Sequence, residues 1–514
     1  LDGSLFNNSF GLDAPTPGGQ TGSQPVSLDA IEQLEVSLAP YDVRQGGFTG
    51  AGVNAVTKSG TNDFKGTAYS FFRNESLIGR RVGDVKLRKQ ELNFNQSGFA
   101  VGGPILKNKL FFFLNGERTR RDDPGLTFRP AQGAAEAEAA LNGQLNGVSR
   151  VLESDLVAIR QRLIDAYGYD PGTFRDFVYR TRDDKALVKL DWNINPANTF
   201  SLRYNYLKSS REQGPHPIAI APSSRVQGVN TLQFSNSGYT INNNLNSVVG
   251  ELNSRFGEKL SNKAQLSYSA FRDFRTLPDA PFFPMLDITR NGTTYVSVGT
   301  EQFSANNKLD QNILQFTDNL SYFAGAHVLT AGVNYERFNF VNAFNLQRYG
   351  YPFFGGLDLD RFFDVTNPTS PNFVDLNAIA AAGGRRPVKQ VDVNVAQLGL
   401  YAQDEWNVTP ALKLTLGIRA DLPIYDTTVP QNQQILEAPL LNGAGEPAQV
   451  DVTRFPKATP LWSPRLGFNY SREGGDYTTQ VRGGTGIFTG RIPFVWISNQ
   501  ASNSQFDAGY TFQI

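Results

Sequence analysis

Cysteine is absent from the 514-residue sequence, and histidine and methionine are nearly absent, with two residues and one. Without thiols the chain can form neither a disulfide framework nor a cysteine zinc site. The two histidines, His216 and His327, have no cysteine to complete a nucleophilic or zinc constellation, so we interpret them as incidental surface residues. We therefore expect a protein that is not an enzyme and that has no catalytic residues, metal site or cofactor.

The sequence also lacks net charge and long hydrophobic runs. Lys and Arg together number 48, as do Asp and Glu, so neither a basic footprint for nucleic acid nor an acidic tail is present. No stretch approaches the ~18 consecutive apolar residues of a transmembrane helix, which excludes helical membrane proteins. The lack of such runs does not exclude membrane β-barrels, because their strands bury only alternate residues in lipid. The chain begins at Leu1 without a start methionine or signal peptide, so we interpret it as a fragment or a processed form.

Aromatic residues and glycine are abundant, with 38 Phe, 19 Tyr and 49 Gly, which suits strands and turns better than helices. Apolar and polar residues alternate most clearly in residues 411–421. The apolar side there is Leu412, Leu414, Leu416, Ile418 and Ala420, and the other side is Lys413, Thr415, Gly417, Arg419 and Asp421. Because successive strand side chains point to opposite faces, this segment has one apolar and one polar face.

The same alternation recurs in segments that supply or approach the ~9 to 11 tilted residues needed to cross a bilayer. In residues 185–193 the apolar side is Ala186, Val188, Leu190 and Trp192, with Leu187 as the one apolar residue on the polar side. In residues 199–206 the apolar side is Phe200, Leu202, Tyr204 and Tyr206. Comparable patterns run through 264–272, 327–338 and 464–470. The repeated pattern predicts many transmembrane strands.

Short and long connections alternate along the chain. Tight links are expected at 195–198, 257–262, 324–326, 407–410 and 472–475, and long loops at about 121–182, 210–237, 278–307, 345–392 and 426–460. Soluble domains rarely tolerate so many loops beyond ~15 residues, whereas outer-membrane barrels pair short periplasmic turns with long extracellular loops. The sequence thus predicts a partial all-β, antiparallel transmembrane barrel of about 13 to 14 strands, starting near Asp63. Trp192 and Trp406 are then expected beside short turns, in an interfacial aromatic girdle.

One long loop contains a predicted helix. Ser154 is the expected N-cap, Leu156, Ile159 and Leu163 recur at helical spacing, and Gly168 followed by Pro171 ends the pattern. Residues Ala134 to Leu141 are expected to form a shorter helix.

Residues 1–61 differ from the rest of the chain. Loops rich in Gly, Asn and Ser surround a short strand expected at Ile31 to Leu38, and glycines in 46–60 permit close backbone approach. Lys58 and Ser59 follow Gly52 at the spacing of a phosphate-binding loop, but Thr57 stands where that motif needs glycine. We interpret four glycines of this stretch as backbone-packing positions, namely Gly46, Gly47, Gly50 and Gly52.

Several stretches resemble TonB-dependent outer-membrane receptors, closest to the Oar-like group. Residues 45–74, QGGFTGAGVNAVTKSGTNDFKGTAYSFFRN, resemble the junction between the plug and the first barrel strand. Further similar stretches are GFAVGGPILKNKLFFFLNGE at 98–117, LYAQDEWNVTPALKLTLGIRAD at 400–421, SPRLGFNY at 463–470 and RGGTGIFTGRIPFVWISNQ at 482–500. Each stretch is only moderately specific, but the order of all of them is typical of the family.

The resemblance implies a closed barrel of ~22 strands with a plug domain in its lumen. Residues 1–61 would then be the C-terminal part of the plug, and residues 62–514 the N-terminal portion of the barrel. An open sheet would leave unpaired edges in lipid, so we expect further strands to complete it. The resemblance also implies the outer membrane of a Gram-negative bacterium as the location. The implied partners are outer-membrane lipid, an unknown extracellular ligand, and the TonB complex through an N-terminal box that this sequence lacks.

Two groups of residues are candidate ligand contacts. Phe6, Asn7, Asn8 and Phe10 resemble an apical plug loop that faces the extracellular ligand, with a structural turn as the alternative. The second group lies in the long loops and consists of aromatic residues that could stack on sugars or grip peptides, or could pack the loops on one another. Its members are Tyr349, Tyr351, Phe353, Phe354, Phe362 and Phe363, with Phe282 and Phe283 in a neighbouring loop.

The same loop carries Asp358, Asp360 and Asp364, which offer oxygen ligands to calcium. Only Asp358 and Asp360 have the close spacing of EF-hand ligands, and the third closely spaced ligand and the glycine of that motif are missing. A solvated acidic loop is therefore favoured.

Three functions follow from these observations. The leading hypothesis is uptake of a bulky ligand, such as a saccharide, peptide or chelate, across the outer membrane. The second is a structural or adhesion barrel that does not transport. The third is a secreted, soluble all-β protein whose polar face meets water.

Overall fold

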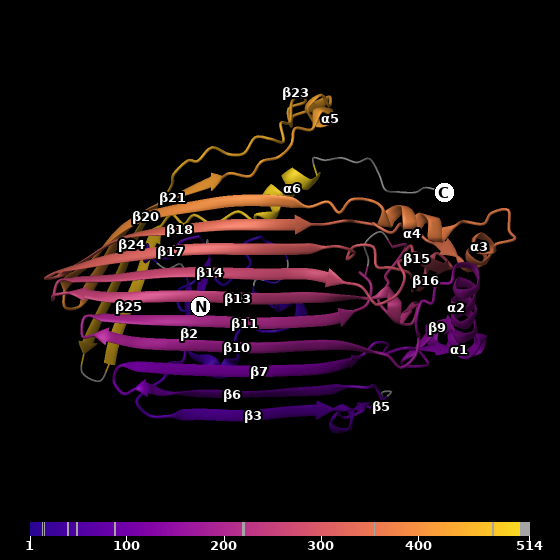
Figure 1. Ribbon diagram of the computed structural model, residues 1–514, viewed down its shortest axis with the longest axis horizontal. Coiled ribbons are helices and arrows are strands. Elements are labelled where there is room, and N and C mark those ends of the chain that lie inside the picture. The colour runs from indigo at the N-terminus through magenta and orange to yellow at the C-terminus, as the bar shows by residue number, and fades with distance from the viewer. Residues whose placement is uncertain are drawn as a thin grey trace.

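A single curved antiparallel sheet dominates the structure (Figure 1), a computed structural model that describes residues 1–503 apart from 13, 15, 39–40, 48–49, 87–88, 218–220, 354 and 475–476. Its thirteen strands follow one another in chain order, and β3 and β25 form the two edges. The strands are β3 (Lys65–Asn74), β6 (Asn93–Leu106), β7 (Leu110–Pro124), β10 (Val178–Asn195), β11 (Asn198–Gln213), β13 (Tyr239–Phe256), β14 (Leu260–Thr276), β17 (Lys308–Ala324), β18 (His327–Ala343), β20 (Val391–Thr409), β21 (Leu412–Tyr425), β24 (Leu461–Gly474) and β25 (Tyr477–Gly486). The predicted all-β, antiparallel fold is confirmed.

The connections between these strands are short at one end of the sheet and long at the other. Turns at 107–109, 196–197, 257–259, 325–326 and 410–411 join strands at the short-turn end. The five longest connections span 125–177, 214–238, 277–307, 344–390 and 426–460, and a connection of moderate length, 75–92, joins β3 to β6 at the same end. Trp192 and Trp406 both lie near the short-turn end, and the Trp406 ring stacks on His327, with ring centroids 5.4 Å apart. His327 is therefore held at the start of β18, where its Nδ1 atom lies 2.8 Å from Asp404.

The two faces of the sheet differ as the alternation predicts. On β21, Leu416 and Ile418 point away from the interior and are 42% and 47% exposed, while Arg419 and Asp421 are 2% and 1% exposed. An antiparallel sheet with an apolar outer face and a polar inner face is the arrangement of a transmembrane barrel wall. None of the helices in the described part of the chain has the length and apolarity that crossing a bilayer requires.

Leu187, the exception to the alternation on β10, has a structural explanation. Its side chain points inward and is buried against Val26 and Ala30 of the N-terminal segment. Ala100 and Phe113 of the neighbouring strands complete this small apolar cluster. An apolar residue on the polar face therefore marks a place where another part of the chain covers the wall.

Four of the five long connections fold together into a cap beyond the strand ends (Figure 1). The cap contains a four-stranded sheet in the order β12, β16, β15, β19, which mixes parallel and antiparallel pairs. Its elements are β8 (Arg129–Ala131), α1 (Ala134–Leu141), β9 (Val148–Leu152), α2 (Glu153–Tyr167), β12 (Leu232–Gln233), β15 (Leu286–Arg290), β16 (Thr293–Val298), β19 (Leu357–Asp358), α3 (Leu359–Val365) and α4 (Leu376–Gly384).

Further short elements between the strands of the large sheet lie outside the cap. They are β4 (Arg81–Val82), β5 (Val85–Lys86), α5 (Gln433–Leu436), β22 (Leu440–Leu441) and β23 (Pro447–Ala448). The fifth long connection, 426–460, contains the last three of these and projects away from the cap (Figure 1).

Helix α2 supplies one side of the cap's apolar core. Leu156, Ile159 and Leu163 are all fully buried, as their helical spacing predicts. Gly168 ends the helix in a left-handed conformation with φ 65°, which glycine adopts without steric cost. The predicted N-cap, Ser154, was wrong, because β9 runs directly into the helix and Leu152 occupies the cap position. The shorter helix is confirmed at Ala134–Leu141.

A fully buried ion pair ties three of the cap loops together. Arg225 donates from Nε to Asp287 at 2.9 Å and from Nη2 at 2.7 Å, and both side chains are completely buried. The Tyr351 hydroxyl donates to the same carboxylate at 2.8 Å. Burial and the adjacent Asp287 charge raise the pKa of Tyr351 well above its ordinary value, so its hydroxyl stays protonated as a donor.

Leu416→Arg is expected to lower the free energy of unfolding by ~2 to 4 kcal/mol, because it places a charge on the lipid face near the middle of β21. Thr415→Arg, one residue away and facing the interior, is the matched control and should cost far less. Urea unfolding of the protein refolded into lipid vesicles measures both values. Equal costs for the two variants would contradict the assigned sidedness.

Arg225→Met is expected to destabilise the cap by ~3 to 5 kcal/mol, because it leaves the Asp287 carboxylate buried and unpaired. The control is Arg160→Gln, which breaks the exposed Arg160–Asp170 pair and should cost ~1 kcal/mol or less. Hydrogen exchange followed by mass spectrometry should show faster exchange in the cap loops and unchanged exchange in the strands. If both variants exchange alike, the buried pair does not hold the cap together.

Candidate ligand site at the N-terminal segment

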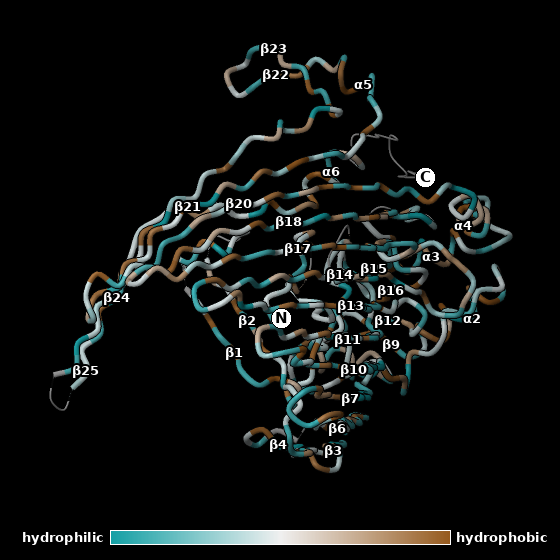
Figure 2. Tube along the Cα trace, turned by 60° about the vertical axis from the view of Figure 1, so that its left-hand side comes forward, coloured by the Kyte–Doolittle hydropathy of each residue, from teal (hydrophilic) through white to brown (hydrophobic). Residues whose placement is uncertain are grey.

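The described residues among the first 61 lie on the concave side of the large sheet (Figure 2). They contain two short 3-10 turns, η1 (Gly19–Thr21) and η2 (Leu28–Ala30), and an antiparallel pair of strands. The first strand, β1 (Ile31–Leu38), is the predicted one, and its partner is β2 (Ala51–Thr57) in the glycine-rich stretch. We refer to residues 1–61 as the N-terminal segment.

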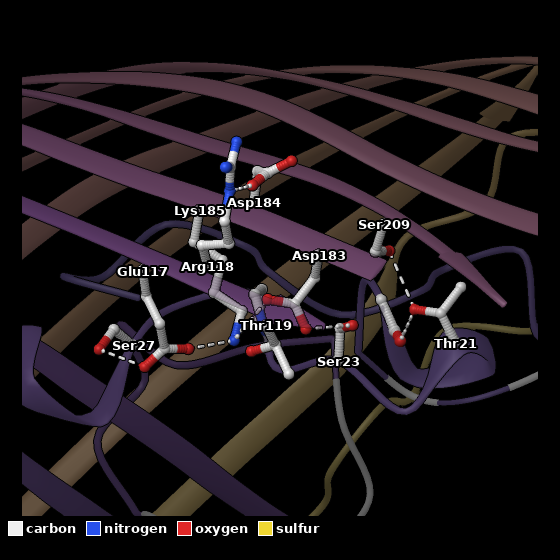
Figure 3. Close-up of polar contacts among 12 residues, drawn as sticks. Thr21, Ser23, Ser27, Glu117, Arg118, Thr119, Asp183, Asp184, Lys185 and Ser209 are labelled. Carbon is white, nitrogen blue, oxygen red and sulfur yellow. Dashed lines mark hydrogen bonds and ion pairs between the residues drawn. The ribbon is translucent and has the colours of Figure 1, made fainter. Parts of the chain in front are cut away.

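Buried polar contacts join the N-terminal segment to the inner face of β7, β10 and β11 (Figure 3). On the wall, the Lys185 ammonium lies 2.5 Å from Glu117 and 3.4 Å from Asp183. From the segment, Ser27 donates to Glu117 at 3.1 Å and Ser23 donates to Asp183 at 3.0 Å. Because each buried carboxylate is paired and hydrogen-bonded, these charges are tolerated inside the protein.

Arginines of the wall bind the segment elsewhere along its length. Arg203 pairs with Asp2, and its Nη2 donates to the Ser4 hydroxyl at 3.0 Å. Arg419 donates to the Val43 carbonyl at 3.1 Å, and a Cβ on Gly46 would lie 2.5 Å from the Arg419 guanidinium. Gly46 thus lies where a side chain would have to displace the Arg419 guanidinium, which fits the backbone-packing role expected for this residue. The interface is mostly polar, apart from the Leu187 cluster and the apical loop.

The apical loop of the segment, residues 6–12, is built around Asn8 and Phe10. Asn8 donates to the Leu12 carbonyl and accepts from the Phe10 amide at 3.1 Å, so its side chain shapes a turn. Phe10 is fully buried beside Phe340, at 5.3 Å between ring centroids. Phe6 is half-buried and Asn7 is exposed. Ligand contact by these four residues stays a prediction.

Residues 487–503, which follow β25, turn back into the interior and contact the apical loop. The Val495 amide donates to the Phe10 carbonyl at 2.8 Å, and Phe494 packs against Phe340 at 5.3 Å. A Cβ on Gly11 would lie 2.4 Å from Pro493, and Gly11 has φ 84°, so both space and backbone demand glycine. Arg491 pairs with the buried Glu336 of β18. We call residues 487–503, which include α6 (Val495–Asn503), the inward loop.

The inward loop was not predicted from the sequence. The available signal was the run Ile492 to Ile497, IPFVWI, which is apolar without the alternation of a membrane strand. A non-alternating apolar run suggests burial on all sides, but it does not say against which partner.

Two cavities lie at opposite ends of β14, with the N-terminal segment between them. The outer cavity, of about 450 Å³, is at the long-loop end and is lined by Leu12 and Gln20 of the segment, Arg275 of β14, Asn342 of β18, and Val495 and Asn499 of the inward loop. The inner cavity, of about 790 Å³, is at the short-turn end and is lined by Gly3, Asp42 and Asn54 of the segment with Lys263 of β14. A volume of ~300 to 1,000 Å³ suits a small-molecule ligand.

Most of the aromatic residues proposed for the long loops pack inside the cap. Tyr349, Tyr351 and Phe353 are buried there, and Tyr349 stacks on Phe282 at 3.9 Å between ring centroids. Phe283 and Phe362 belong to the same apolar core, and Phe363 packs against it. Phe354 lies outside the described residues. The burial gives these side chains a packing role, and their contact with a ligand stays a prediction.

Two of the three acidic residues of this loop, Asp358 and Asp364, serve local structure. Asp358 caps α3 by accepting from the Arg361 amide at 2.8 Å. Hydrogen bonds from Ser370 and Asn372 hold the pKa of Asp364 below its ordinary value. Within the residues that the structure describes, no group of three or more His, Asp or Glu side chains is arranged to hold a metal ion.

Comparison with known proteins identifies the family. Residues 56–514 match the family described as "Outer membrane beta barrel domain". The chain is 24% identical over 474 residues to the TonB-dependent transporter Oar of Myxococcus xanthus, covering 80% of this chain and 42% of that protein. It is 32% identical over 125 residues to the probable TonB-dependent siderophore receptor PirA of Acinetobacter baumannii, covering 24% of this chain and 15% of that protein. The chain thus spans less than half the length of these relatives.

Solved structures show the same fold at low sequence identity. The outer membrane transporter YddB of Escherichia coli aligns with a TM-score of 0.54 and 12% identity, over 94% of this chain and 51% of that one. The ferripyoverdine receptor of Pseudomonas aeruginosa aligns with a TM-score of 0.50 and 13% identity, over 88% of this chain and 46% of that one.

The family match covers most of the chain, and both of these solved structures are described as outer-membrane proteins. The family match and the similar proteins agree with a sheet that has one apolar and one polar face. Together they place this protein in the outer membrane of a Gram-negative bacterium. The protein therefore belongs to the outer membrane β-barrel family and is homologous to TonB-dependent transporters.

Proposed function

We propose that the protein takes up a bulky ligand across the outer membrane, with the N-terminal segment acting as the C-terminal part of a plug. The ligand binds in the outer cavity, and movement of the segment then joins the outer cavity to the inner one. The TonB complex drives this movement through a region ahead of residue 1. No catalytic step is part of the proposal, and the ligand belongs to the saccharide, peptide or chelate classes.

The observation that carries the proposal is the polar interface between the segment and the wall. Ser23, Ser27 and Asp2 contact charged wall residues, and such contacts can be exchanged for water when the segment moves. Polar interfaces within a chain resemble those of transient complexes. The names of the relatives, a transporter and a siderophore receptor, support the same function.

A non-transporting structural or adhesion barrel is the alternative. Deleting the gene separates the two functions, because only transport predicts that growth on some nutrient is lost. A deletion strain that takes up every tested nutrient normally would favour the alternative.

Locking the segment to the wall is expected to abolish uptake. The Thr21 and Ser209 hydroxyl oxygens lie 2.9 Å apart across the interface (Figure 3), so Thr21→Cys with Ser209→Cys should form a disulfide in a chain without other cysteines. Uptake of the nutrient identified by deletion should fall to the level of the deletion strain under oxidising conditions and recover on reduction.

The control disulfide lies wholly within the wall. Ser247 on β13 and Ser269 on β14 also have hydroxyls 2.9 Å apart, and Ser247→Cys with Ser269→Cys should leave uptake unchanged. Full uptake with the Thr21–Ser209 disulfide demonstrably formed would rule out movement of the segment at this place.

Filling the outer cavity is expected to weaken ligand capture. Gln390 is exposed and lines this cavity, so Gln390→Trp should raise the KM of uptake by about tenfold or more through steric exclusion. Gln144→Trp, at an exposed position in the cap far along the chain, is the control and should leave KM unchanged. An unchanged KM for Gln390→Trp would place the ligand elsewhere.

A further inference from the structure

A group of charged residues lies on the outer face of β7, β10 and β11, near the long-loop end. Alternation puts Arg118 and Arg120 of β7 on the same face as Arg182 and Asp184 of β10. Figure 3 shows Arg118 and Asp184 on the opposite side of the strands from Glu117 and Lys185. These side chains therefore point away from the interior, toward the surroundings of the barrel.

The strand register places two of these arginines directly opposite each other. Arg120 pairs in register with Arg182, and like charges in such a position repel. Backbone carbonyls hold both guanidinium groups in place. Arg120 donates to the carbonyls of Thr119 and Asp183 at 2.8 Å, and Arg182 donates to the carbonyl of Arg121 at 2.7 Å. The two cations are thus fixed near one another.

Carboxylates on this face offset only part of the positive charge. Arg118 and Arg120 share the single carboxylate of Asp184, each at 2.8 Å, and Arg182 pairs with Asp122. Lys208 of β11 lies in register with Asp184 of β10, is exposed, and has no hydrogen bond or ion pair with any residue in the described ranges. The Arg118 side chain is 68% exposed. Cations therefore exceed carboxylates here, and an anion can reach them from outside.

The position of the charged group along the strands shows that it lies beyond the apolar outer belt of the sheet. Leu114 of β7, Val188 of β10 and Tyr204 of β11 lie in register on the same outer face. Arg118 lies four residues beyond Leu114, which is ~13 Å along the strand. The charged group thus sits above the apolar belt, where charge is tolerated and lipid headgroups lie.

We propose that Arg118, Arg120, Arg182 and Lys208 bind the phosphate of a lipid headgroup in the outer leaflet. Guanidinium groups match phosphate oxygens with paired hydrogen bonds, and an anion between Arg120 and Arg182 relieves their repulsion. The apolar belt directly below receives the acyl chains, which a free anion does not have. We call these four residues the outer basic group. Its role is independent of the proposed uptake.

Removing charge from the outer basic group is expected to weaken lipid binding. Native mass spectrometry of the full-length protein in detergent, titrated with phosphatidic acid, measures the affinity. Arg118→Gln with Arg120→Gln should lower it by about tenfold or more. Asp184→Asn removes a competing carboxylate and should raise the affinity, a gain that a misfolded protein would not show. Arg160→Gln with Arg385→Gln, two exposed cap arginines, is the control and should change nothing.

Three results would overturn the proposal. The first is wild-type affinity in the Arg118→Gln, Arg120→Gln variant. The second is an Asp184→Asn variant that binds phosphatidic acid no more tightly than the wild type. The third is complete displacement of phosphatidic acid by inorganic phosphate at the same concentration, which would indicate a site for free phosphate rather than for lipid.

Discussion

The two-residue period of a β-strand is the constraint on which this structure depends. In a membrane every backbone polar group of a strand has to pair with a neighbouring strand, so side chains alone distinguish the two faces. One face must then be apolar toward lipid and the other polar toward the interior, as Leu416 and Arg419 illustrate on β21. The polar interior in turn determines how the N-terminal segment is held, namely by ion pairs and hydrogen bonds such as those of Glu117 and Asp183.

Much of the fold was predictable because its cause is local. Alternation and turn residues act over a few positions, which is why the strands, the short turns and helix α2 could be read from the sequence. The error at Ser154 has a tertiary cause, since β9 pairs with β8 and carries strand structure up to the first helical residue. Leu187 looked like an irregularity for the same kind of reason, because its partner Val26 lies far away in the chain.

The candidate site was much less predictable. The outer cavity combines the N-terminal segment, the ends of several strands and the inward loop, and no short stretch of sequence contains enough of it to be recognised. The aromatic residues of the long loops illustrate the opposite difficulty. A sequence shows that Tyr351 is near other aromatics, but only the buried Arg225 and Asp287 beside it reveal that it belongs to a core.

The apolar core that the cap loops share limits where residues can be inserted into these loops. Because four loops contribute to one apolar interior, an insertion in any of them disturbs side chains of the other three. The connection 426–460 contributes no residue to that core. Its two ends pack on the inward loop through Val429 and Val452, so the exposed tip at 437–447 is where an inserted peptide tag would disturb its neighbours least.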